Sequence, residues 1–166
     1  MTWRPNALDQ YGRRMILDGV VGAGDGVAFD DGDDRGRVIV SSAMTDGAYS
    51  VLEWVVAPSK DEGNVAGGFG VHRHGSFEET FLVRGGELEF MLDGHIVTLA
   101  SGDFVRVSRT TRHGYRNLTS DPVDLIVTFV PGGFEELFVK YRTDGGAANG
   151  PGFVNEATSR FDSFFE

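Results

Sequence analysis

Short β-prone runs, separated by glycine-containing turns, divide the chain between residues 38 and 130. The clearest run is Glu87 to Leu92, in which acidic and apolar side chains alternate strictly. Such alternation is typical of an antiparallel strand with one buried face. The Asp93-Gly94 pair that follows is a strong two-residue hairpin signal. Strands are expected at residues 38–40, 49–56, 79–84, 87–92, 96–99, 104–107 and 122–130. This spacing predicts an all-β fold, a small antiparallel barrel or sandwich.

A chain of 166 residues is most simply one domain. We divide it into an N-terminal arm at 1–36, a barrel at about 37–131 and a C-terminal helical extension at 132–166. Within the arm, Gly22 to Arg37 is rich in glycine and aspartate and is interpreted as a solvated loop. A short amphipathic helix is expected early in the extension, because Phe134, Leu137, Phe138 and Tyr141 follow helical spacing. The last segment carries four phenylalanines and is expected to pack back on the barrel: Phe153, Phe161, Phe164 and Phe165.

The composition limits the partners that this protein can have. Twenty-five acidic against fifteen basic residues give a net charge of −10, which argues against binding to nucleic acid or to an anionic membrane surface. The absence of cysteine excludes disulfides and thiolate zinc sites. No apolar stretch is long enough for a signal peptide or a membrane-spanning helix, so a cytoplasmic protein is expected.

Histidine and glutamate residues gather in one part of the sequence and predict a metal site. His72 and His74 are two residues apart, so in a strand both imidazoles point to the same face. Glu79 follows after Gly75, where a bend would bring its carboxylate to the same point, and His113 would arrive from another strand. Imidazoles with one carboxylate suit one divalent first-row metal per chain, such as iron, manganese, nickel, copper or zinc.

Two neighbouring residues are interpreted differently. His95 follows the Asp93-Gly94 turn and is expected at the surface. Glu78 precedes Glu79 and should face the other way on a strand, as a surface acid or a support for the site.

The spacing of these residues resembles the two motifs of the cupin family. In the first motif, His72-Arg73-His74 is followed after four residues by Glu79 and after six more by Gly86. In the second, Gly102 is followed by Ser108-Arg109-Thr110, His113 and Asn117. Three positions depart from the family pattern: Ala66 stands for the first glycine, and Ser108 and Thr110 stand for the turn proline and glycine. The resemblance implies a small antiparallel barrel with a metal inside, held by residues 72, 74, 79 and 113.

The run from His72 to Pro131-Gly132-Gly133-Phe134-Glu135 further resembles single-domain cupins similar to quercetin dioxygenase. That resemblance implies a dioxygenase that cleaves an enol- or phenol-bearing aromatic, polyketide or flavonol-type small molecule with dioxygen. Glu79 would then be a catalytic base as well as a ligand. Phe81 and Tyr115 are interpreted as substrate contacts, because each shares a strand face with a metal ligand. The resemblance also implies a homodimer.

Two other functions remain open from the sequence. One is a redox-neutral metal-dependent cyclase or isomerase that acts on a polyketide-like or keto substrate. The other is a non-catalytic cupin that binds or senses a small molecule. The fold alone does not decide among these functions. Oxygen consumption separates the dioxygenase from both alternatives, because only the dioxygenase uses dioxygen.

Overall fold

The computed structural model describes residues 21–31, 33–59, 70–143 and 150–165, and the backbone of 7–8 and 14–15. Most of the expected N-terminal arm, the departure at Ala66 and residues 144–149 of the C-terminal extension lie outside these ranges. No helix in the described ranges is long and apolar enough to cross a membrane.

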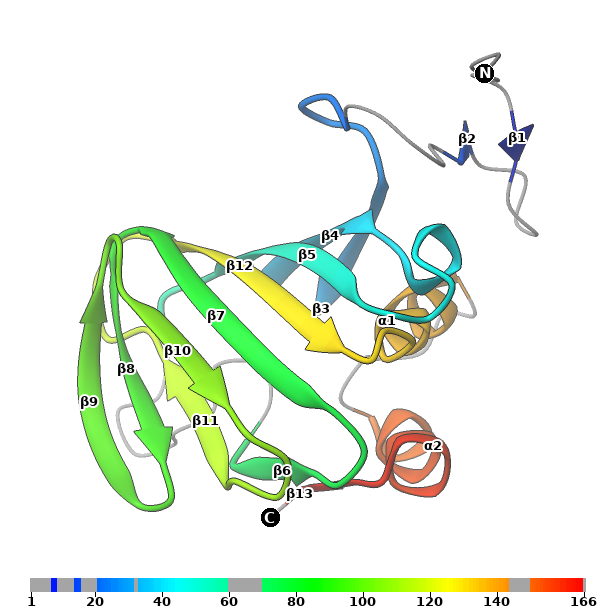
Figure 1. Ribbon diagram of the computed structural model, residues 1–166. Helices are drawn as coiled ribbons and strands as arrows, with labels where there is room; N and C mark the ends of the chain where they lie inside the picture. The colour runs from blue at the N-terminus through cyan, green and yellow to red at the C-terminus, as the bar shows by residue number, and fades with distance from the viewer. Residues whose placement is uncertain are drawn as a thin grey trace.

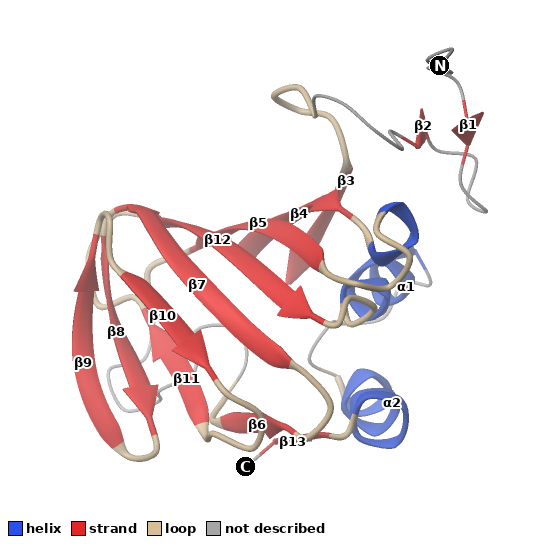
Figure 2. Ribbon diagram, viewed as in Figure 1, coloured by secondary structure: helices blue, strands red, loops and turns tan. Residues whose placement is uncertain are grey.

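Two antiparallel sheets face one another (Figure 1), which confirms the expected all-β fold. The six-stranded sheet has the order β10 (Phe104–Val107), β7 (Glu78–Gly85), β12 (Val123–Val130), β5 (Ser50–Val56), β4 (Asp34–Val40) and β3 (Val27–Asp31). The five-stranded sheet has the order β13 (Ser163–Phe165), β6 (His72–His74), β11 (His113–Arg116), β8 (Glu87–Leu92) and β9 (His95–Ala100). A separate pair joins β1 (Ala7–Leu8) to β2 (Arg14–Met15). Figure 2 shows both helices, α1 (Glu135–Thr143) and α2 (Pro151–Phe161), beside the sheets at one side.

Alternating side chains of the strands form the hydrophobic core. On β12, the side chains of Val123, Leu125, Val127 and Phe129 are all buried between the sheets. The expected hairpin is confirmed, because Asp93 and Gly94 both have positive φ angles, 46° and 84°, between β8 and β9. Positive φ at both central residues is what a type I′ turn requires.

The interpretation of Gly22 to Arg37 as a solvated loop is wrong over most of its length. Strands β3 and β4 form a hairpin at the edge of the six-stranded sheet, so the sheet begins at Val27, before the expected boundary at residue 37. The high aspartate content concealed an alternating pattern in which Phe29 and Asp31 point inward. Gly36 lies beneath Phe29, and a Cβ atom there would be 2.1 Å from the ring.

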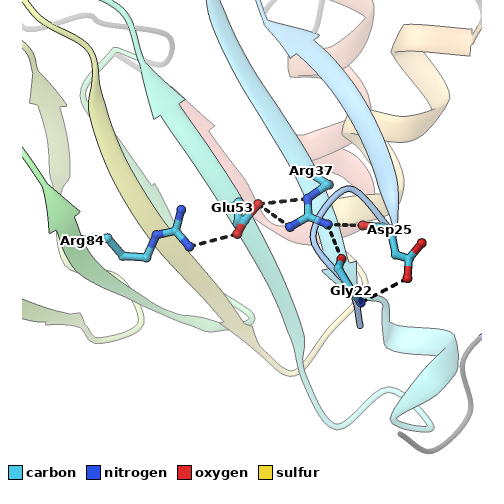
Figure 3. A network of polar contacts seen from close by, with 5 residues as sticks. All are labelled: Gly22, Asp25, Arg37, Glu53 and Arg84. Atoms are coloured by element: carbon cyan, nitrogen blue, oxygen red, sulfur yellow. Dashed lines mark hydrogen bonds and ion pairs between the residues drawn. The ribbon is translucent and has the colours of Figure 1, made fainter. Parts of the chain in front are cut away.

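A polar network on the outer face of this sheet holds the turn before β3 in place (Figure 3). The Arg37 guanidinium donates to the carbonyls of Gly22 and Asp25 and forms an ion pair with Glu53 at 2.5 Å. Arg84 on β7 donates to the other oxygen of Glu53 at 3.0 Å. Because these groups are partly exposed, the network adds little free energy, but it links the turn to β4, β5 and β7.

Two acidic side chains are buried at the end of the β3–β4 hairpin. Asp34 accepts hydrogen bonds from Trp54 Nε1 at 3.2 Å and from the Ala57 backbone at 2.8 Å. Asp31, its partner across the hairpin, is 2% exposed, and neither of its carboxylate oxygens has a hydrogen-bond partner within the described part of the chain. Burial, and then the charge of Asp34, raise the pKa of Asp31 from 3.8 to about 7.

The Asp31→Asn variant should therefore be more stable than the wild type at pH 8 but not at pH 4. Between about pH 4 and pH 7 the folded protein holds a proton that the unfolded chain has released, so stability falls as the pH rises. Asparagine removes the cost of ionising this buried carboxyl and should therefore stabilise the protein by on the order of 2–4 kcal/mol at pH 8. Urea unfolding at both pH values measures it, with the exposed Asp30→Asn as control. Parallel stability curves for wild type and Asp31→Asn would contradict the prediction.

The C-terminal extension begins as expected and then differs. Helix α1 is confirmed, and the preceding Pro-Gly-Gly-Phe-Glu run is anchored by the buried carboxylate of Glu135. That carboxylate accepts hydrogen bonds from the backbone of Ser42 at 2.6 Å and of Gly133 at 2.7 Å. The extension also contains a second helix, α2, which the sequence analysis did not predict. It starts at Pro151, a residue suited to a first helical turn, and is followed by β13.

Candidate metal centre

Three strands bring the four expected ligands together inside the barrel. His72 and His74 are the buried ends of β6, and Glu79 lies on the inner face of β7 after the bend at Gly75. His113 begins β11, directly beside His72 in the antiparallel register. One ligand atom from each side chain lies within 4.8 Å of those of the other three, and all four residues are buried. The expectation that His113 arrives from a separate strand is confirmed.

The Nδ1 atom of each imidazole makes a hydrogen bond to a neighbouring group. His72 Nδ1 donates to the Gly70 carbonyl at 2.8 Å, and His113 Nδ1 donates to the Thr111 carbonyl at 3.0 Å. His74 Nδ1 lies 2.7 Å from the Ser163 hydroxyl. Such outer partners fix the tautomer and orientation of metal-binding histidines. With Nδ1 engaged in this way, Nε2 is the ring nitrogen through which each histidine would bind a metal ion.

The Glu79 carboxylate lies among these Nε2 atoms. Its Oε2 lies 3.0 Å from His113 Nε2 and 3.3 Å from His74 Nε2. Burial alone would raise the pKa of Glu79, but the His113 and His74 interactions outweigh it and lower the pKa to about 2. The carboxylate is therefore ionised, as a metal ligand must be.

Burial has the corresponding effect on two of the histidines. It lowers the pKa of His72 well below 6.5, and the neighbouring His113 and His74 lower it further. It also lowers the pKa of His74, against the opposing influence of Glu79. Both imidazoles are therefore neutral at pH 7, which is the form that binds a metal ion.

The residues present fit a divalent metal ion. Among the described residues, the buried His74 Nε2 makes no hydrogen bond and lies 3.3 Å from the ionised Glu79 carboxylate, an unfavourable arrangement unless a cation accepts its lone pair. Three imidazole nitrogens and one carboxylate, with no cysteine, match the ligand preferences of first-row divalent metals. The cluster could hold one such ion, and its ligand chemistry does not select among iron, manganese, nickel, copper and zinc.

A small aromatic pocket opens on this cluster. Its lining comprises Trp54, His72, His74, Glu79, Phe81, Tyr115, Val127, Phe129, Phe134, Phe138 and Phe165. The structure thus places Phe81 and Tyr115 in the pocket wall, while their role as substrate contacts stays a prediction. Tyr115 keeps its phenol proton, because burial and then the charge of Asp34 raise its pKa well above 10.0. Sequence reasoning missed Trp54, whose buried position follows from the alternation of β5, and Phe165, for which no local signal exists.

The other singled-out residues lie outside the cluster. His95 is exposed on β9, as expected. Glu78 points away from the pocket and forms an ion pair with Arg106 at 2.6 Å. Thr110, at the family's glycine position, adopts a left-handed φ of 67°, which is unusual for a β-branched residue. Its backbone donates to the His74 carbonyl at 2.7 Å, so the turn keeps its place beside the ligands without glycine.

Asn117, the last residue of the second motif, is fully buried and has a structural role. Its side-chain amide donates to the carbonyls of Val56 at 3.1 Å and Asp121 at 2.8 Å. Its oxygen accepts a hydrogen bond from the Thr119 backbone at 2.9 Å. The residue therefore fixes the loop between β11 and β12.

Comparison with known proteins agrees with this fold and cluster. Residues 63–129 match the cupin domain family called Cupin_2. The chain is 31% identical over 148 residues to quercetin 2,3-dioxygenase of Bacillus subtilis, a match that covers 89% of this chain but 41% of that protein. It therefore spans less than half the length of that curated relative.

Solved structures of low sequence identity share the fold. KdgF from Halomonas sp. has a TM-score of 0.59 and 16% identity over 72% of this chain and 98% of that one. The Streptomyces nucleoside dehydratase Pac13 has a TM-score of 0.55 and 18% identity over 72% of this chain and 87% of that one.

The two motifs, the double-sheet barrel and the domain match define the class of protein. The chain belongs to the cupin superfamily. Within that superfamily it is similar to quercetin dioxygenase.

Proposed function

We propose that this protein is a metal-dependent dioxygenase that acts on an enol- or phenol-bearing aromatic, polyketide or flavonol-type small molecule. The observation that carries the proposal is the buried cluster of three imidazoles and one carboxylate at the base of an aromatic pocket. The similarity to a quercetin dioxygenase supports the same reaction class. His72, His74, Glu79 and His113 would hold the ion. When bound, it would supply Lewis-acid and redox chemistry to an enolate oxygen and to dioxygen.

Glu79 is proposed to take the proton from the enol or phenol hydroxyl of the substrate. In the metal-free cluster burial alone would raise its pKa, but the neighbouring His113 and His74 lower it to about 2, so the carboxylate is ionised. A bound metal ion would also favour the ionised form of the carboxylate, which is the form that can accept a proton. Its Oε2 lies 3.0 Å from His113 Nε2 and 3.3 Å from His74 Nε2, so it would be close to a substrate oxygen bound to the metal.

The aromatic wall is proposed to orient the substrate and keep out water. Phe81 packs edge-on against Tyr115, with ring centroids 5.8 Å apart. Planar aromatic substrates are favoured by such surfaces, because rings bury a large apolar area and pack in offset or edge-on geometries. A pocket without bulk water also protects a reactive enolate from side reactions.

Elemental analysis combined with an oxygen electrode tests this function. The metal-replete protein should contain about one divalent ion per chain and should consume dioxygen with a flavonol, a β-diketone or an aromatic polyketide. Protein without stoichiometric metal would contradict the proposal. Metal-dependent conversion of these substrates without oxygen uptake would contradict it too, and would identify a redox-neutral cyclase or isomerase instead.

We also propose that the protein is cytoplasmic and forms a homodimer. Strand β9 is at the edge of the five-stranded sheet, and Ile96 and Val97 on it are 55% and 41% exposed. An unpaired edge strand with exposed apolar side chains favours pairing with another chain. Light scattering should give about twice the chain mass of 18.0 kDa, and a monomer at micromolar concentration would contradict the proposal.

A further inference from the structure

The C-terminal strand β13 lies directly beside the metal-binding strand β6. The two strands are antiparallel, and their register pairs Ser163 with His74 and Phe165 with His72. Because alternate residues of a strand share a face, Ser163 and Phe165 both point toward the cluster. Phe164 points the other way, and the Arg73 guanidinium lies 4.6 Å from the centre of its ring. Figure 1 shows β13 following α2 and running next to β6.

The chain is held closely at the start of this strand. Asp162 ends α2 with a left-handed φ of 52°, and its carbonyl accepts a hydrogen bond from the Gly75 backbone at 2.7 Å. A Cβ atom at Gly75 would be 1.9 Å from the Asp162 carboxylate, which would have to move to make room for it. The Thr158 hydroxyl donates to the Ser163 carbonyl at 2.8 Å and fixes the strand from the other side.

The hydrogen bonds of Ser163 determine which nitrogen of His74 carries the proton. The hydroxyl of Ser163 donates to the Phe161 carbonyl at 3.2 Å. Since a hydroxyl has one proton, its oxygen must accept the hydrogen bond from His74 Nδ1 at 2.7 Å. That arrangement places the imidazole proton on Nδ1 and leaves the Nε2 lone pair to bind a metal ion. Ser163 is fully buried, so no water competes for this bond.

We propose that β13 completes the metal centre, with Ser163 as the positioning residue that fixes the tautomer and orientation of His74. Phe165 contributes beside it, because its ring stacks on that of His72 at 5.2 Å and forms part of the pocket wall. The match to the cupin family ends at residue 129, so the family motifs do not account for this strand. The inference rests on the metal centre of the proposed function and is independent of the dioxygenase reaction.

The test uses Co²⁺ as the probe metal and compares Ser163→Ala with a matched control, Ser159→Ala, an exposed position on α2. Competition with a chromophoric chelator should show that Ser163→Ala weakens Co²⁺ binding by about 10–100-fold. The absorption spectrum of bound Co²⁺ should shift as well, because the orientation of one ligand changes. Ser159→Ala should keep both properties, and Ser163→Thr should restore the spectrum by returning a hydroxyl. Wild-type affinity and spectrum in Ser163→Ala would overturn the proposal.

A measurement on the unaltered protein gives a second test that does not depend on any variant folding. Long-range ¹H–¹⁵N spectra of the metal-free wild type should show the His74 proton on Nδ1. A His74 proton on Nε2 would overturn the proposal. Neither result depends on oxygen consumption, so a failure of the dioxygenase assignment would leave both readouts interpretable.

Discussion

Replacing His113 with alanine should abolish stoichiometric metal binding. His113 is fully buried, and its Nε2 is 3.0 Å from Glu79 in a cluster whose four ligand atoms lie within 4.8 Å of one another. Loss of this imidazole removes one candidate ligand and also the polar group that lies 3.0 Å from the buried Glu79 carboxylate. We expect the metal content to fall from about one ion per chain to a trace after dialysis against a weak chelator, as measured by elemental analysis.

His95→Ala is the matched control for this variant. His95 is exposed on β9, outside the cluster, so its removal should leave the metal content unchanged. His72→Ala should behave like His113→Ala. The site assignment would be wrong if a folded His113→Ala protein retained one ion per chain at wild-type affinity.

The Glu79→Gln variant should retain much of the metal but lose most of its turnover. Glutamine preserves the size of the side chain and one oxygen ligand, while it removes the charge and the basicity of the carboxylate. Removal of a general base typically costs a factor of about 10²–10⁴ in rate. The rate of oxygen uptake should fall by this factor when measured on protein whose metal content has been determined in the same sample.

Glu78→Gln provides the control for Glu79→Gln, because the adjacent acid faces outward and pairs with Arg106. It should reduce neither metal content nor turnover. If metal-loaded Glu79→Gln turned over at the wild-type rate, Glu79 would remain a ligand but not a base. A loss of metal equal to that of His113→Ala would instead assign the loss of activity to coordination.

Much of the fold could be predicted from local sequence patterns. The alternation at Glu87–Leu92 and the Asp93-Gly94 turn are confirmed as β8 and the β8–β9 hairpin. These features depend on side-chain periodicity and on backbone preferences at positive φ, which act over a few residues. The spacing of His72, His74 and Glu79 likewise places three ligands on one strand and the start of the next.

The predictions from sequence were wrong where polar or turn-forming residues lie in buried strands or helices. Asp31 and Asp34 are buried on the inner face of the β3–β4 hairpin, although their sequence is that of an exposed loop. Helix α2 was missed because its run from Pro151 contains glycine, asparagine, threonine and serine, which favour turns and caps in isolation. Packing of Phe153 and Ala157 against the core determines the helix there.

The sequence by itself determined the β architecture, the cupin motifs and the identity of the four candidate metal ligands. These follow from periodicity, turn chemistry and short spacings, whose physical causes lie within a few residues. Only the tertiary structure decided that His113 lies beside His72, that Asp31 is buried without a partner and that Ser163 holds His74. Each of these depends on pairing or packing between distant segments. The Ser163–His74 contact spans 89 residues, and no local pattern records which strand will cover the site.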